Sequence, residues 1–298
     1  MDLDRRYTYS LDRSIMHLCS DDMKDMTLQD LFEDLIPSKR VRGMLVSGLV
    51  TSEGRSLKAD DRLSANGIDI VIYRPHEPYG YIPELPEILY EDELIVAVHK
   101  ERGMLVHTDG SSRPNLTDRV RSLYLRTDID PLPLHRLDRE TAGIVLFSKS
   151  FVFQPLLDSM MENKEIRRTY EALVRGKFDE GLSKIDLPIG RNRHESGKYI
   201  VSATGKKAVT HVSFEDYSKR YDISKVRCVL DTGRTHQIRV HLSHMGYPIV
   251  NDDLYGELEP AVSGMGLSAA EMTLIHPLSK ERIVIRDKRD DDWEGLFL

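Results

Sequence analysis

One carboxylate stands between two guanidinium groups near the middle of the chain, in the stretch His135-Arg136-Leu137-Asp138-Arg139-Glu140-Thr141-Ala142-Gly143. The positive charges on either side favour the ionised form of Asp138. The planar side chains of Arg136 and Arg139 are also suited to bidentate contacts with phosphate. This pattern indicates a carboxylate held charged beside an anionic ligand. The alternative interpretation is a turn that leads into the apolar run 144–147, with ion pairs on the surface.

A second polar stretch lies further along the chain, Leu230-Asp231-Thr232-Gly233-Arg234-Thr235-His236-Gln237-Ile238-Arg239-Val240-His241. Its glycine turn leads into a predicted helix, and the free N–H groups at a helix N-terminus attract phosphate. Thr235 is expected to cap this helix, which ends at Gly246. Arg239 lies one turn inside, where its guanidinium can reach a carboxylate across a cleft, unless the stretch is only a capped helix with surface arginines. The buried side of the helix is predicted to carry Ile238, Leu242 and Met245.

The composition is that of a globular protein. The chain has 298 residues, of which 40% are hydrophobic and 31% charged, enough for one large domain and a smaller one. No run reaches the roughly eighteen apolar residues that cross a bilayer, and the first residues lack an apolar signal core. We therefore expect a cytoplasmic protein without a membrane segment. The only two cysteines, Cys19 and Cys228, exclude a disulfide framework and a cysteine-ligated zinc site.

The distribution of charge favours a local anion-binding groove. The net charge of −7 argues against a protein that simply coats nucleic acid. Basic residues nevertheless gather between residues 113 and 207, whereas acidic runs occur at 21–22, 60–61 and 290–292. A basic middle with acidic margins predicts a groove that binds a polyanion.

Three motifs that suggest cofactors or metals do not meet the requirements of those sites. The stretch 264–269 is glycine-rich but lacks the βαβ unit of a dinucleotide site. The Gly-Lys-Lys at 205–207 lacks the upstream glycine and the hydroxyl residue of a P-loop. His236, His241 and His244 are scattered around a helix and do not form an HExxH arrangement. We expect no metal and no cofactor.

The chain before residue 88 divides into three predicted parts. Residues 1–25 show no sustained period and are expected to form a loosely attached arm. Residues 26–75 predict a small helix-helix-strand unit, with Thr27 capping the first helix and Ser38 the second. This unit loosely resembles the small RNA-binding domain of many rRNA-modifying enzymes and a ribosomal protein, although a helix pair that only packs on the main domain is the alternative. Residues 76–87 are rich in proline and predict a stiff linker.

Residues 88–298 are predicted to form one α+β domain with a mixed, mainly antiparallel sheet and flanking helices. The strands and helices alternate irregularly, without the steady βαβ repeat of a parallel sheet. In the alternating run 168–174, Tyr170 and Val174 are expected on the same face of a strand. Further strands are predicted at 94–98, 208–215 and 223–231.

Together the two polar stretches resemble signatures of the RluA-type pseudouridine synthases, enzymes that isomerise uridine in rRNA or tRNA. The first is similar to the family's HRLDxxTSG motif and the second to its TGRxHQIRVH motif. The resemblance extends roughly over residues 90–290. It includes the first family motif at 100–106, the tyrosine strand at 168–176, the GHPIxGDxxYG motif at 246–256 and a C-terminal His-Pro at 276–277. The chain departs from these motifs at Ala142, Tyr247 and Asn251.

The resemblance implies the pseudouridine synthase fold and a role for each site residue. Asp138 is the catalytic aspartate, Arg239 orients it and keeps it charged, and Tyr170 stacks on the uracil and helps to remove the carbon-5 proton. Arg136 fills the gap left when the nucleotide flips out of its stack. Further RNA contacts are implied for Lys100, Arg139, Thr141, Arg234, Thr235 and His236. Because substrate and product are isomers, the reaction needs no cofactor or metal.

Two other classes of protein remain as alternatives. An RNA-binding or ribosome-assembly protein could keep the fold without the activity, but the presence of Asp138, Tyr170 and Arg239 argues against it. A hydrolytic nuclease would need a second carboxylate or a metal set beside Asp138. The sequence predicts a structured rRNA or tRNA as partner without identifying the uridine, and a monomer is the default expectation.

Overall fold

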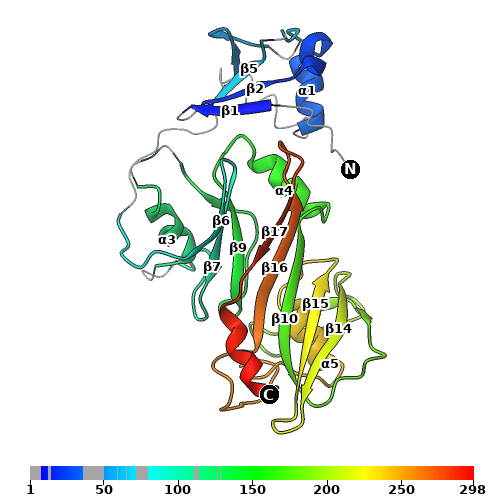
Figure 1. The fold of residues 1–298 in the computed structure, drawn as a ribbon. Coiled ribbons are helices and arrows are strands. Elements are labelled where there is room, and N and C mark those ends of the chain that lie inside the picture. Colours follow the sequence, from blue (N-terminus) through cyan, green and yellow to red (C-terminus); the bar gives the residue numbers. More distant parts are fainter. Residues whose placement is uncertain are drawn as a thin grey trace.

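The computed structural model describes residues 8–12, 15–35, 50–58, 60–64, 66–71, 80–110, 114–125, 127 and 129–298. A small N-terminal sheet precedes a large sheet that is flanked by helices (Figure 1). The second short helix expected from Ser38, with its basic residues Lys39, Arg40 and Arg42, lies outside the described residues, as does part of the linker. No helix in the described ranges is long and apolar enough to cross a membrane.

In the described part of the N-terminal region, the sheet has five strands in the order β1-β2-β5-β3-β4, and each pairing is antiparallel. The expectation of a loosely attached arm over residues 1–25 is wrong for the described part, because β2 pairs with β5 and buries Met16 and Leu18. A short 3-10 helix, η1 (Asp21–Asp25), follows β2. The strands are β1 Thr8–Asp12, β2 Ile15–Cys19, β3 Val50–Ser52, β4 Arg55–Ser56 and β5 Ile68–Val71.

The predicted start of the first helix is present, and a tight turn follows β3. Before α1 (Leu28–Leu35), the Thr27 hydroxyl accepts a hydrogen bond from the Asp30 N–H at 3.2 Å. In return, an Asp30 carboxylate oxygen accepts one from the Thr27 N–H at 2.8 Å, which completes a capping box. Between β3 and β4, Glu53 and Gly54 have φ values of 50° and 76°, as a two-residue hairpin turn requires.

Within the described residues, the large sheet has ten strands. Its main path is β11-β14-β15-β10-β16-β9-β7-β6, with β17 paired to β16 and β8 paired to β9. Among the strands that the structure describes, only β9 and β16 pair in parallel. The strands are β6 Ile88–Glu91, β7 Ile95–Lys100, β8 Leu132–Pro133, β9 Ala142–Ser148, β10 Arg167–Arg175, β11 Lys184–Asp186, β14 Val209–Ser218, β15 Ile223–Leu230, β16 Leu267–Ile275 and β17 Arg282–Arg286. Strands β12 (Ile189–Arg191) and β13 (Tyr199–Val201) form a separate hairpin.

This topology confirms the expected α+β class with a mixed, mainly antiparallel sheet. The helices beside the large sheet are α3 Leu116–Ser122, α4 Gln154–Glu162, α5 Gln237–His244 and the C-terminal 3-10 helix η2 Arg289–Leu296. The prediction for α5 is wrong in two details. His236, not Thr235, is the residue at its N-cap, and Met245 is exposed rather than part of the buried side.

The central strands are covered on both faces. Every residue of β7 and β9 is buried, which accounts for their unbroken apolar runs. Alternate residues enter different cores: Ile95 and Ala97 belong to one buried cluster, whereas Val96 and Val98 belong to the other. Because both cores pack against these strands, the loop that precedes β9 is attached to a rigid strand at its C-terminal end.

The register around the parallel pair brings the predicted site residues together. Gly143 on β9 lies beside Ala269 on β16, and Ala269 in turn lies beside Tyr170 on β10. The loop that carries Asp138 runs directly into β9, so it reaches the same part of the sheet as Tyr170. Gly143 has a φ of 108°, and a Cβ at this position would collide with the backbone of Ala269. Only glycine allows the two strands to approach this closely.

We predict that Gly143→Ala destabilises the protein much more than Gly176→Ala. Gly176 has a similar positive φ of 84° but open space where a Cβ would be. Backbone strain in the Gly176→Ala variant should therefore lower its free energy of unfolding by only about 1–2 kcal/mol. Gly143→Ala adds a backbone collision and should lose roughly 3 kcal/mol or more. Urea unfolding of both variants measures the difference, and equal losses would show that the close approach of β9 and β16 is not a constraint.

Candidate active site

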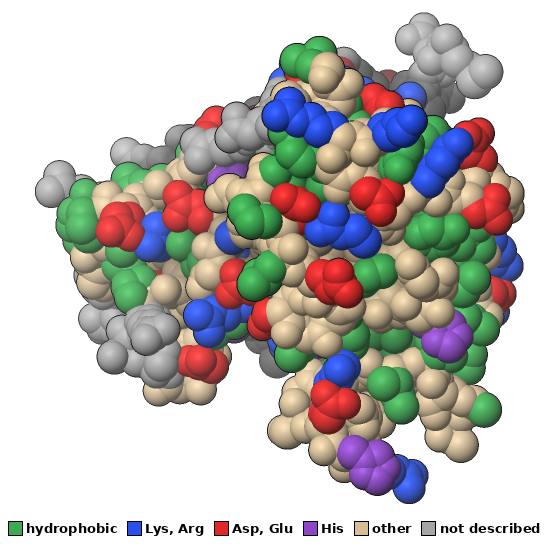
Figure 2. Space-filling view, turned by 90° about the horizontal axis from the view of Figure 1, so that it is seen from below, with side chains coloured by type: hydrophobic (Ala, Val, Ile, Leu, Met, Phe, Trp, Pro, Cys, Tyr) green, Lys and Arg blue, Asp and Glu red, His purple; other side chains and the backbone are tan. Residues whose placement is uncertain are grey.

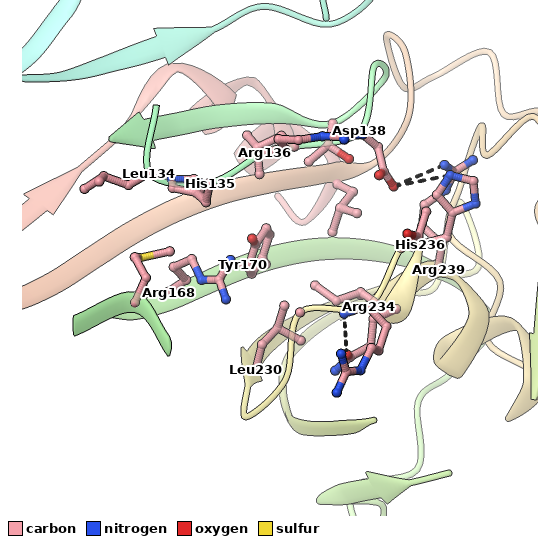
Figure 3. Close-up of a pocket in the computed structure, with 18 of the residues that line it drawn as sticks. Leu134, His135, Arg136, Asp138, Arg168, Tyr170, Leu230, Arg234, His236 and Arg239 are labelled. Atoms are coloured by element: carbon pink, nitrogen blue, oxygen red, sulfur yellow. Dashed lines mark hydrogen bonds and ion pairs between the residues drawn. The ribbon is translucent and has the colours of Figure 1, made fainter. Parts of the chain in front are cut away.

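A cleft of about 590 Å³ lies where the loop before β9, strand β10 and the loop before α5 meet (Figure 3). Eight of the predicted site residues line it: Arg136, Asp138, Thr141, Tyr170, Arg234, Thr235, His236 and Arg239. The other two, Lys100 and Arg139, do not line it. Segments more than a hundred residues apart in the chain therefore converge on one space, as the two polar stretches predict.

The carboxylate of Asp138 faces the guanidinium of Arg239 across this cleft. Arg239 Nη1 lies 3.3 Å from Asp138 Oδ2, so the expected pairing of the two stretches is present. The Arg239 side chain is only 4% exposed, whereas Asp138 retains 27% exposure on the cleft side. The Asp138 carboxylate is therefore paired with a buried positive charge and remains accessible to a ligand.

The guanidinium of Arg239 is held from behind by Asp252. Arg239 Nε and Nη2 donate to the two carboxylate oxygens of Asp252, each at 2.7 Å, and the Asp252 side chain is fully buried. Asp252 Oδ1 also accepts from the backbone N–H groups of Leu254 and Tyr255. A second donor contact from Nη2, at 2.9 Å, reaches the largely exposed Asp253.

These contacts fix both the charge and the direction of the guanidinium. Burial works against the charged form of Arg239, but the hydrogen bonds and charge of Asp252, together with Asp138, outweigh it and raise the pKa of Arg239. A bidentate pair also restricts the guanidinium plane. With Nε and Nη2 engaged by Asp252, Nη1 is the nitrogen left to meet Asp138.

Tyr170 forms the wall of the cleft opposite the Asp138 loop (Figure 3). Its side chain is 5% exposed, and its strand neighbours are Cys228 and Ala269. Burial raises the pKa of the Tyr170 phenol, Arg168 lowers it through charge and a hydrogen bond, and Asp138 raises it. The phenol therefore stays protonated near neutral pH and presents an aromatic face with a hydrogen-bond donor.

The loop before α5 is held by the side chain of Gln237. Its Oε1 accepts hydrogen bonds from the Thr232 hydroxyl at 2.7 Å and from the Arg234 N–H at 3.0 Å. Its Nε2 donates to the carbonyl oxygen of Val209 at 2.9 Å. The loop is thus tied to strand β14, which places Thr235 and the residue after it at the rim of the cleft.

The residues predicted to contact RNA differ in their exposure and in their position relative to the cleft. Arg136 is exposed and lies at the mouth of the cleft, and Arg234 is exposed with Nε donating to the carbonyl of Lys207 at 2.9 Å. Thr141 is buried at the cleft wall, where its N–H donates to the carbonyl of Asp138. Arg139 is exposed but lines a neighbouring hollow instead.

Lys100 is not placed to contact RNA, so this prediction is wrong. Its side chain is fully buried, and Nζ donates to the carbonyl oxygens of Glu101, Met104 and Arg139 at 2.8–2.9 Å. Burial lowers the pKa of Lys100 to about 7, while Glu140 and Asp138 raise it. Lys100 instead anchors the backbone of the loop that carries Asp138.

The three departures from the family motifs have local structural reasons. Ala142 is buried beside Ser268 in the parallel strand pair. The Tyr247 hydroxyl accepts a hydrogen bond from the Asp179 N–H at 3.2 Å. Asn251 has a φ of 57°, a conformation that asparagine tolerates better than most residues, and its Nδ2 donates to three backbone carbonyls. None of the three lines the cleft.

Several residues of the site were not assigned a role from the sequence. Asp252 and Tyr255 belong to the motif at 246–256, which supported the resemblance but was given no function. Arg168 lines the cleft, and its place two residues before Tyr170 on an alternating strand was the signal that both share a face. His107 also lines the cleft, and no pattern in the sequence indicates it.

Comparison with known proteins identifies the family of the chain. Residues 94–244 match the family model described as RNA pseudouridylate synthase. An uncharacterized RNA pseudouridine synthase of Bacillus subtilis (strain 168), YhcT, is 33% identical over 225 residues, which cover 74% of each protein. The ribosomal large subunit pseudouridine synthase D of Vibrio vulnificus (strain CMCP6) is 32% identical over 293 residues, 91% of this chain and 89% of the relative.

A solved structure shares the fold. Human RNA pseudouridylate synthase domain containing 1 superimposes with a TM-score of 0.59 over 74% of this chain and 91% of that protein, at 24% identity. The fold and the matches together define the class as an isomerase that acts on RNA. The chain belongs to the RNA pseudouridylate synthase family, and the resemblance to its RluA-type members is confirmed.

We predict that Asp252→Asn destabilises the fold far more than Asp253→Asn, although both carboxylates contact the same guanidinium. Asp252 is fully buried and its removal leaves a buried charge poorly paired, which should cost about 3–5 kcal/mol. Asp253 is 66% exposed, and its loss should cost about 0–1 kcal/mol. Urea unfolding of both variants at neutral pH checks the contrast, and a small loss in Asp252→Asn would contradict the anchoring role.

Proposed function

We propose that the protein converts a specific uridine of a structured RNA, rRNA or tRNA, into pseudouridine, with Asp138 as the catalytic carboxylate. The observation that carries the proposal is the Asp138 carboxylate in the lining of the cleft, partly exposed and 3.3 Å from the buried guanidinium of Arg239. The N1–C1′ bond of uridine breaks, the base turns, and C5 joins C1′. The C5 proton leaves and N1 gains a proton, so the product is an isomer of the substrate.

An ionised Asp138 serves either of two routes. As a nucleophile it adds to the substrate and is later released, and as a base it assists glycosidic cleavage and deprotonation at C5. Both routes need a carboxylate that is charged and fixed in direction. The contact with Arg239, itself held by Asp252 on the side away from the cleft, is proposed to fix the direction of this carboxylate.

Tyr170 is proposed to stack on the uracil. Its ring is buried in the cleft wall across from Asp138, and a flat aromatic face suits a flipped base. Burial raises the pKa of its phenol, which favours stacking and hydrogen-bond donation over direct proton abstraction. The C5 proton is then transferred to Asp138 or to water, with Tyr170 positioning the ring.

Base flipping is proposed to depend on Arg136. The target atom of a paired or stacked nucleotide is out of reach, and extruding it costs a few kcal/mol. Arg136 is exposed at the mouth of the cleft, beside the place where Asp138 acts. Its long, flat side chain can stack in the gap that the nucleotide leaves. Arg234 and Arg139, both exposed, are proposed to bind RNA phosphates near the cleft.

The charge pattern supports local rather than general RNA binding. On the face seen in Figure 2, basic and acidic side chains are intermingled and no patch of one sign dominates. This face therefore offers phosphate no continuous basic patch, whereas Arg136, Arg168 and Arg234 line the cleft and are proposed to bind phosphate there. Because a relative that matches most of the chain is a ribosomal large subunit pseudouridine synthase, large-subunit rRNA is the first substrate to test. Residues 26–75 are proposed to add RNA contacts outside the cleft.

We predict that Asp138→Asn loses pseudouridine formation by at least about 10³-fold while RNA binding stays within a few-fold of wild type. The measurements are tritium release from [5-³H]uridine-labelled rRNA and filter binding of the same RNA. Substantial turnover by the variant would contradict the catalytic assignment. RNA binding by the wild type without isomerisation would favour a binding protein, and strand cleavage would favour a nuclease.

We predict that Arg136→Ala and Arg139→Ala differ in their dependence on RNA structure. Arg136→Ala should reduce the rate at least about tenfold more on a folded RNA than on a flexible oligonucleotide with the same target, because unstacking costs a few kcal/mol. Arg139 lies outside the cleft, so its substitution should affect both substrates to the same extent. The rates of both variants on both RNAs test this, and an equal loss for Arg136→Ala would contradict base flipping by that residue.

A further inference from the structure

His236 occupies an unusual position between Asp138 and two tyrosines. Its backbone has a φ of 55°, in the left-handed region, at the start of α5. The rings of Tyr199 and Tyr255 meet its ring edge-on, with centroids 5.5 Å and 5.7 Å away. Left-handed backbone at a residue other than glycine is uncommon and clusters at functional sites. The geometry holds the imidazole at the cleft, with Nδ1 towards Tyr255 and Nε2 towards Asp138.

The hydrogen bonds of Tyr255 decide which nitrogen of His236 carries the proton. The Tyr255 hydroxyl accepts from the backbone N–H of Tyr199 at 2.8 Å and lies 3.0 Å from His236 Nδ1. Within the described part of the chain, His236 Nδ1 is the one acceptor in reach of the hydroxyl's own hydrogen. If Tyr255 donates to Nδ1, then the neutral imidazole must carry its proton on Nε2.

The charge of Asp138 favours the same arrangement. His236 Nε2 lies 3.9 Å from Asp138 Oδ2, the oxygen that also meets Arg239 (Figure 3). An N–H directed at this oxygen is attractive, whereas a lone pair directed at it would be repelled. Burial lowers the pKa of His236 although Asp138 raises it, so the ring is neutral near pH 7. Catalytic hydrogen bonds are often longer in the free enzyme and shorten when the substrate binds.

We propose that His236 is a positioning residue for Asp138: Tyr255 fixes its tautomer, so that it directs an Nε2–H at the Asp138 oxygen that Arg239 contacts. Two donors then hold Oδ2, and Oδ1 is left for the reacting nucleotide. The tautomer itself is independent of what the enzyme does. Its effect on rate rests on the proposed uridine isomerisation.

The tautomer is tested by ¹⁵N NMR of the histidines in the full-length wild type, Tyr255→Phe and Tyr247→Phe, with His236→Gln used to assign the signal. In the wild type, Nε2 of His236 should be the protonated nitrogen and Nδ1 the bare one. Because Asp138 still favours a proton on Nε2, Tyr255→Phe should keep this tautomer in the majority but raise the fraction protonated on Nδ1 above that of the wild type. Tyr247→Phe is the control, since it also removes a hydroxyl that accepts a backbone N–H, and it should leave the signal unchanged. A proton on Nδ1 in the wild type would overturn the proposal.

The effect on rate is tested by comparing His236→Gln with His236→Asn. A glutamine amide can place its N–H near the position of Nε2, whereas asparagine is shorter but tolerates the left-handed backbone better. If His236 acts as a donor to Asp138, the glutamine variant should form pseudouridine at least about tenfold faster than the asparagine variant at saturating RNA. A purely structural role predicts the reverse order, and that order would overturn the proposal. If the wild type forms no pseudouridine, the proposed function fails, while the NMR result still decides the tautomer.

Discussion

The structure of the site depends on one buried positive charge. The guanidinium of Arg239 is almost completely removed from water, and such a charge is tolerated only when paired and fully hydrogen-bonded. Asp252 meets that requirement from inside the fold, and Asp138 meets the remaining nitrogen from the cleft. The direction of the Asp138 carboxylate therefore follows from a pairing that the fold must make for its own stability.

The sheet brings the members of this pairing together. The parallel contact of β9 with β16 aligns the end of the Asp138 loop with the middle of β10, where Tyr170 lies. Lys100 holds the same loop through the carbonyl oxygen of Arg139, and Gln237 ties the opposite loop to β14. Rigid strands thus carry the two walls of the cleft, and the groups proposed to meet RNA stand on short loops at its rim.

Sequence patterns predicted those site residues whose position follows from the periodicity of their own strand or helix. Alternation placed Tyr170 on the cleft face of its strand, and helix position placed Arg239 within reach of a carboxylate. Tertiary contacts decided the rest. Lys100 ends an apolar strand as a surface lysine would, but its Nζ is buried among the carbonyl oxygens of the nearby Glu101 and Met104 and of Arg139, which lies 39 residues away. Residues 15–19 have no helical period because they form a strand, which pairs with the neighbouring β1 on one side and with the distant β5 on the other.

We propose that Arg239 orients Asp138 through the several nitrogens of its planar guanidinium, and not through its positive charge alone. Arg239→Lys keeps the charge but cannot contact Asp252 through two nitrogens while reaching Asp138 with a third. The most direct measurement is the single-turnover rate of pseudouridine formation by this variant at saturating RNA, together with its dissociation constant for the same RNA. The claim predicts a rate lower by about 100-fold with the dissociation constant within roughly threefold of wild type. A rate close to wild type, or a loss confined to binding, would contradict it.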